Sequence, residues 1–145
     1  MTKWDRRFIG IAQLVATWSK DPSTGVGAVI VDNHKRVVSM GFNGLPQRVL
    51  DNYDDMDRDE KLRRTIHAED NALLFARGSV ADYTIYVTHP PCARCAAKII
   101  QAGIGRVVSR PPWNSFAERW ADDMKSAATM FVEAGVQFDY VDVAS

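Results

Sequence analysis

The chain has 145 residues, of which 46% are hydrophobic and 25% are charged, and this fits one globular domain that buries a core without covalent cross-links. Because 18 Lys and Arg residues balance 18 Asp and Glu residues, the formal net charge is zero, which argues against a protein whose main task is to bind nucleic acid. No run approaches the roughly 20 apolar residues of a membrane helix, and the first residues lead into an amphipathic segment rather than an apolar signal core, so we expect a cytoplasmic protein without a membrane partner.

The N-terminal part of the chain predicts a helix followed by a β-hairpin. Apolar residues recur with helical spacing over residues 4–18, and Thr2 with Asp5 forms an imperfect capping box at the start. A stretch that contains Pro and Gly then breaks the pattern. The runs VGAVIV (26–31) and RVVSMG (36–41) are rich in β-branched residues and flank a polar turn, so they predict two paired strands.

The rest of the chain alternates helices and strands. The polar stretch 50–65 predicts a loop with a possible short helix. Beyond it, the pattern predicts helices over residues 68–77, 92–102 and 116–134, and strands over 83–88, 106–109 and 136–143.

This order of elements predicts the fold class. Helices that join the later strands need crossover connections, which place consecutive strands parallel and right-handed. The result is a three-layer α/β/α sandwich with a five-stranded mixed sheet, whose last two strands are parallel because a helix connects them. We find no internal repeat and no linker, so residues 1–145 form a single domain.

The two cysteines of the chain, Cys92 and Cys95, lie where a helix is expected to begin. Residues three apart share a helix face, so both sulfur atoms can reach one ion. The partial positive charge of a helix N-terminus favours thiolate, the form that binds zinc, and in a reducing compartment such a pair indicates a metal site rather than a disulfide. His67, at the start of the preceding helix, can supply a third ligand.

Three protein ligands point to a catalytic site. A structural zinc site is normally closed by four protein ligands, whereas a catalytic site leaves a position for water. Zinc lowers the pKa of that water from 15.7 toward about 7, and a neighbouring carboxylate can accept its proton. Glu69, two residues after His67, is the candidate for this general acid and base.

Two other interpretations of these residues are open. A lone C-x-x-C pair in a cytosolic chain can be a redox pair, and two cysteines with one histidine can belong to a zinc module that binds a partner without catalysis. The combination H-x-E, then a strand, then P-C-x-x-C at the start of a helix is more specific, since it is the signature of zinc-dependent nucleobase deaminases. It favours a catalytic zinc site.

Longer motifs resemble the cytidine deaminase superfamily, and within it the deoxycytidylate (dCMP) deaminases. The matching stretches, which cover nearly the whole chain, are SKDPSTGVGAVIVD, GFNGLP, HAEDNAL and PCARCAAKIIQAGIGRVV. The first and the last of these distinguish this branch from deaminases of free nucleosides. The parallel final strand, expected from the connecting helix alone, agrees with the resemblance.

The resemblance implies an activity and a set of site residues. It implies zinc-dependent hydrolysis of dCMP to dUMP and ammonia, with Zn2+ on His67, Cys92 and Cys95 and with Glu69 moving protons to N3 of cytosine and to the leaving amine. It also implies substrate contacts from four positions: Asn43 to the sugar hydroxyl, the backbone of Ala68 to the base, and Ser19 and Lys20 to the phosphate or its loop. A fifth contact, Trp113 to the pyrimidine, is expected because Trp113 follows the fourth strand at the sheet edge where ligands of open α/β folds bind. For Trp113, packing against the last helix is an equally good interpretation.

The resemblance also implies properties of the whole protein. Members commonly form homo-oligomers, typically hexamers, that dCTP activates and dTTP inhibits, and their dUMP supplies thymidylate synthesis. Some members hold a second, structural zinc in the segment between the GFNG and HAE motifs. No Cys or His occurs between Leu45 and Ile66 here, so we predict one Zn2+ per chain.

Several related substrates stay open as alternatives. They are 5-methyl- or 5-hydroxymethyl-dCMP, free cytidine, guanine and the adenosine of a tRNA. A tRNA deaminase must bind an RNA stem and usually shows a basic face, which the zero net charge disfavours.

Overall fold

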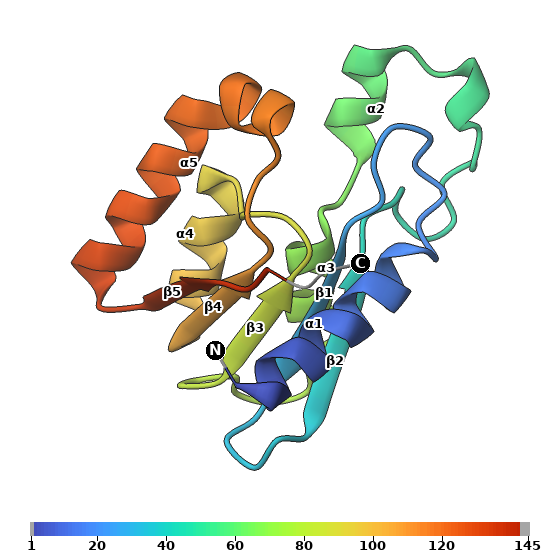
Figure 1. The fold of residues 1–145 in the computed structure, drawn as a ribbon. Helices are drawn as coiled ribbons and strands as arrows, with labels where there is room; N and C mark the ends of the chain where they lie inside the picture. The colour runs from blue at the N-terminus through green and yellow to red at the C-terminus, as the bar shows by residue number, and fades with distance from the viewer. Residues whose placement is uncertain (1, 143–145) are drawn as a thin grey trace.

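Within residues 2–142, which the structure describes, five strands form one mixed sheet in this computed structural model (Figure 1). They are β1 (Gly27–Val31), β2 (Val37–Phe42), β3 (Thr84–Val87), β4 (Arg106–Ser109) and β5 (Gln137–Tyr140). Their order in the sheet is β2-β1-β3-β4-β5. Strand β1 is antiparallel to both neighbours, whereas β3, β4 and β5 are parallel. The predicted mixed sheet with parallel final strands is confirmed.

The helices lie close to the predicted ranges, with shifted ends. They are α1 (Lys3–Ala16), α2 (Arg58–Arg64), α3 (Ala68–Phe75), α4 (Ala93–Gln101) and α5 (Asn114–Ala134), with a 3-10 turn at Tyr53–Asp55. Helix α3 ends two residues before the predicted Arg77, because Ala76 is already extended. The last strand ends at Tyr140, three residues before the predicted Val143, which lies outside the described residues.

The two faces of the sheet bury different side chains against different helices. One face packs Val29, Val31, Tyr86 and Val108 against α1. The opposite face packs the alternate residues of the same strands, such as Ile30 and Ile85, against α3, α4 and α5. This alternation is the two-residue period of a strand, and it produces the predicted three layers. No helix within the described range is long and apolar enough to span a membrane.

Helix α3 lies unusually close to β2. A side chain at Gly41 would overlap the Ala68 carbonyl oxygen, and its Cβ would lie 2.5 Å from the Ala72 nitrogen. Two hydrogen bonds fix the approach: Ser39 Oγ donates to the Ala72 carbonyl at 2.6 Å, and Asn71 Nδ2 donates to the Phe42 carbonyl at 2.8 Å. The sheet therefore sets the position of the residues at the start of α3.

Candidate active site

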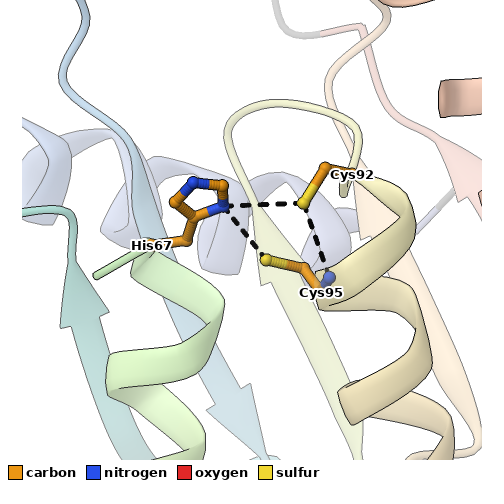
Figure 2. Close-up of side chains that lie close together, drawn as sticks. All are labelled: His67, Cys92 and Cys95. Atoms are coloured by element: carbon orange, nitrogen blue, oxygen red, sulfur yellow. Dashed lines mark hydrogen bonds between the residues drawn. The ribbon is translucent and has the colours of Figure 1, made fainter. Parts of the chain in front are cut away.

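The N-termini of α3 and α4 bring three side chains together (Figure 2). His67 is the N-cap of α3, and Cys92 is the N-cap of α4. Cys95 follows in the first turn of α4, where its backbone N–H donates to Cys92 Sγ at 3.4 Å. Both N-cap residues have extended backbone conformations, and the helical conformation starts at the next residue in each case.

The three side chains fit a single zinc ion. His67 Nδ1 lies 3.2 Å from Cys95 Sγ and 3.6 Å from Cys92 Sγ, and all three candidate ligand atoms lie within 4.8 Å of one another. Tetrahedral zinc with Zn–S near 2.3 Å and Zn–N near 2.0 Å separates N and S ligands by about 3.5 Å. The observed spacing therefore matches a ligand set of two cysteines and one histidine, and it identifies Nδ1 as the histidine nitrogen that faces the sulfur atoms.

The hydrogen bond between the two cysteines favours the thiolate form of Cys92 and raises the pKa of the Cys95 thiol. The pKa of Cys92 is lowered to about 4, mainly by its hydrogen bond with Cys95 and further by its hydrogen bond with His67. Thiolate is the form that binds a metal. Next to the cysteines, Asp70 of α3 forms a 2.8 Å salt bridge with Lys98 of α4, which joins the two helices that carry the ligand residues.

Glu69 lies in the first turn of α3 with only 4% of its surface exposed. Burial raises the pKa of Glu69 to about 7, although its own backbone N–H and the charge of His67 oppose this rise. A carboxyl group with a pKa near neutral can both accept and return a proton at physiological pH. This is the electrostatic property that a general acid and base needs.

A cavity of about 200 Å³ opens over these residues. His67, Ala68, Glu69 and Cys92 line its inner end. Further lining residues come from the loop before β1, from the residue after β2, from α2 and the residue that follows it, from the segment after β3 and from α5: Asp21, Ser23, Thr24, Val26, Asn43, Arg58, Lys61, Leu62, Thr65, His89, Pro90, Arg119, Trp120, Asp123 and Met124. Two of the three candidate ligand residues, His67 and Cys92, thus share one cavity with the buried carboxyl and with groups from distant segments.

Two of the five expected substrate contacts, Asn43 and Ala68, line this cavity. Asn43 also stabilises the neighbouring loop: its Oδ1 accepts from the Val26 N–H at 2.8 Å, and its Nδ2 donates to the Thr24 carbonyl at 2.9 Å. Ala68 is the first residue of α3, so helix geometry leaves its N–H without an intrahelical acceptor. That N–H is available to a ligand.

The other three expected contacts lie outside the residues that line the cavity. Ser19 donates from Oγ to the Asn43 carbonyl at 2.8 Å, so it supports the loop next to the cavity. Lys20 is largely exposed and pairs with Asp51 at 2.6 Å. Trp113 lies just before α5, where its ring meets the His89 ring edge-on at a centroid distance of 4.7 Å. Through His89, Trp113 adjoins the cavity wall.

Sequence reasoning missed the contributions of α2 and α5 to the cavity. Asp57 caps α2 by accepting from the Glu60 N–H at 2.8 Å, and this Asp-x-x-Glu spacing was a recognisable helix start. On α5, the Asp123 carboxylate accepts from the Ala93 N–H at 2.7 Å and so caps α4. No sequence signal indicates that contact, since the two residues are 30 positions apart.

Comparison with known proteins identifies the family. The family model described as the cytidine and deoxycytidylate deaminase zinc-binding region matches residues 2–110. A relative from Aliivibrio fischeri, named an uncharacterized deaminase in the luxG 3′ region, is 47% identical over 141 residues, covering 97% of this chain and 95% of the relative. Human deoxycytidylate deaminase is 35% identical over 143 residues, covering 94% of this chain and 78% of the human protein.

The fold agrees with that family. The crystal structure of dCMP deaminase from cyanophage S-TIM5, in complex with dCMP and dUMP, superimposes with a TM-score of 0.77. It is 24% identical and covers 97% of this chain and 99% of its own, a level of identity at which the likeness shows the fold alone. The match to the family model covers both ligand segments and most of the sheet. This chain therefore belongs to the cytidine and deoxycytidylate deaminase family and is an enzyme that acts on C–N bonds.

Proposed function

We propose that the protein hydrolyses dCMP to dUMP and ammonia with one zinc ion held by His67, Cys92 and Cys95. One observation carries this proposal: a buried carboxyl, Glu69, lines the same cavity as His67 and Cys92, which together with Cys95 form a group whose spacing fits zinc. The similarity to human deoxycytidylate deaminase supports dCMP as the substrate. The dCMP and dUMP bound to the cyanophage protein support the same class of ligand.

The residues of the site have different roles in this reaction. His67, Cys92 and Cys95 would hold a zinc ion, and a zinc ion bound there would supply a water activated as a nucleophile near neutral pH. Glu69 accepts the proton of that water, delivers a proton to N3 of cytosine and assists the departure of ammonia from C4. Its burial suits this work, because a pKa of about 7 allows both steps at one pH.

The remaining groups of the cavity hold the substrate in place. The free N–H of Ala68 and the Asn43 side chain offer hydrogen bonds to the base and to the sugar hydroxyl. The apolar wall of Val26, Pro90 and Met124 excludes water from the ring. Ser19 keeps the Asn43 loop in place through its 2.8 Å hydrogen bond.

An ammonia-release assay on zinc-loaded protein tests the proposal. The panel is dCMP, CMP, deoxycytidine, dCTP, 5-methyl-dCMP and guanine. We expect the highest kcat/KM with dCMP. Turnover of only an unphosphorylated substrate would leave the deaminase chemistry in place and overturn the assignment of the substrate.

The resemblance implies further properties, which we carry as predictions. They are a cytoplasmic enzyme that supplies dUMP for thymidylate synthesis, assembly into a hexamer, activation by dCTP and inhibition by dTTP. Repeating the assay with each effector, and measuring the mass in solution by light scattering, tests regulation and assembly separately.

A further inference from the structure

The cavity has two chemically different ends. Its inner end holds His67, Glu69 and Cys92, and the base of the substrate occupies this end in the proposed reaction. Its outer rim is formed by α2 and the first turns of α5, and Figure 1 shows α2 and the start of α5 beyond the same end of the sheet. An anionic group on a ligand whose base reaches Glu69 must therefore lie toward the rim.

Two arginines of the rim are free to form an ion pair with a ligand. Arg58 begins α2, and Arg119 lies in the second turn of α5. Among residues 2–142, no side-chain hydrogen bond or salt bridge uses either guanidinium. Lys61, the third cation of the rim, is different: its Nζ lies 3.1 Å from Asp21 Oδ1 and 2.8 Å from Ser23 Oγ.

The carboxylates of the rim are engaged with other groups. Asp21 pairs with Lys61 and also accepts from the Ser23 N–H at 2.8 Å. Asp123 accepts from the Ala93 N–H at the start of α4. Neither carboxylate neutralises Arg58 or Arg119, so the free positive charge of the rim comes from these two arginines.

We propose that Arg58 and Arg119 bind the 5′-phosphate of the substrate and so select a nucleoside 5′-monophosphate over the free nucleoside. This inference rests on the proposed function. A guanidinium is planar and presents paired N–H donors that match two phosphate oxygens. Two such groups on separate helices bind one phosphate from two sides.

The positions of the two arginines suit a role in specificity. The family match ends at residue 110, so Arg119 lies outside the segment that carries the shared ligand and proton-transfer residues. Arg58 lies on a separate short helix that contributes none of them. This phosphate site uses other residues than Ser19 and Lys20, which are expected from the sequence to contact the phosphate or its loop. Lys20 pairs with Asp51 and lies outside the cavity lining.

The test measures binding separately from turnover. Equilibrium dialysis of zinc-loaded protein gives the affinities for dUMP and for deoxyuridine, and their ratio reports recognition of the phosphate. We expect Arg58→Gln and Arg119→Gln each to lower this ratio by about 10- to 100-fold, the range expected for hydrogen bonds to a charged group. Arg63→Gln on α2 and Lys125→Gln on α5 are the matched controls, because both residues lie outside the cavity lining, and both should keep the ratio.

Each outcome decides between the two proposals. An unchanged ratio in both arginine variants, or a wild-type protein that binds dUMP no better than deoxyuridine, overturns the phosphate site. A wild-type protein that shows the expected ratio but releases no ammonia from dCMP keeps the phosphate site and overturns the proposed function.

Discussion

Glu69 and the three candidate ligand residues lie close together at two helix starts, but they have separate tasks. The ligand residues define a position for a metal, whereas Glu69 is a buried titratable group beside it. Removing a ligand and removing the carboxyl should therefore have different consequences.

Glu69→Gln should keep zinc and fold but lose activity. The amide has nearly the same shape but cannot accept and return a proton, so we expect kcat for dCMP to fall by about 10²- to 10⁴-fold. Zinc content by atomic absorption should stay at one ion per chain. Glu133→Gln, an exposed residue near the end of α5, is the control. Near-normal turnover by Glu69→Gln would show that another group transfers the proton.

Cys95→Ser should remove both zinc and the stability that zinc provides. Metal that binds only the folded state stabilises it by about 4 kcal/mol at a free concentration 1,000 times its Kd. Adding zinc to metal-free wild type should therefore raise its Tm, and the variant should show little response. An equal rise in Tm for both proteins would mean that zinc binds elsewhere.

At the scale of elements, the contact between α3 and β2 determines where the active site forms. Gly41 allows the two backbones to approach, and Ser39 and Asn71 fix them by hydrogen bonds. His67 and Glu69 begin the same helix, so any displacement of α3 moves both of them relative to α4.

Gly41→Ala should displace α3 and impair the site. The added methyl group would overlap backbone atoms of α3, and overpacking of this kind costs about 1–3 kcal/mol. We expect a lower free energy of unfolding in urea and weaker zinc binding. Gly10→Ala is the matched control, because its Cβ meets nothing within 4 Å and alanine favours the exposed middle of α1. Equal stability of the two variants would contradict the close approach.

At the scale of the whole molecule, a polar network around the buried Asp5 carboxylate joins α1 to three strands. Arg106 of β4 donates to Asp5 Oδ1 at 2.9 Å and Oδ2 at 3.0 Å, and it also donates to Asp139 of β5 at 2.9 Å. Tyr86 of β3 donates to Asp5 Oδ1 at 2.8 Å. Burial alone would raise the pKa of Asp5, but these hydrogen bonds outweigh it and hold the pKa well below its usual range.

This network makes stability depend on pH in a defined direction. Because the pKa of Asp5 is lower in the folded than in the unfolded state, its stabilisation is full above the unfolded value of about 4 and is lost as pH falls below it. Asp5→Asn should cost about 2 kcal/mol at pH 7, the range for hydrogen bonds to a charged group, and should flatten the acid limb of the stability curve. Urea unfolding between pH 3 and pH 7 measures both effects.

A control variant separates this network from ordinary surface charge. Asp51→Asn removes an exposed ion pair with Lys20 and should change stability little at any pH. An unchanged acid limb in Asp5→Asn would mean that the acid sensitivity of the protein comes from other carboxyl groups.

The features that depend on local pattern could be predicted from the amino-acid sequence. Apolar spacing predicted the helices and strands, and the helix between the last two strands predicted that they are parallel. The spacing of Cys92 and Cys95 predicted that both sulfur atoms reach one ion, and the H-x-E and P-C-x-x-C motifs predicted His67 as the third ligand residue at that position. The Thr2–Asp5 capping box was also recognisable and is confirmed.

The features that join segments far apart in the sequence emerged only from the folded chain. The second role of Asp5, as a partner of Arg106 across 101 positions, has no local signature. The same holds for the rim of the cavity, to which α2 and α5 both contribute although residues 50–65 were predicted only as a loop with a possible short helix. Local pattern specifies which face of an element is buried, whereas the packing of whole helices around one sheet specifies which charged side chains surround a ligand.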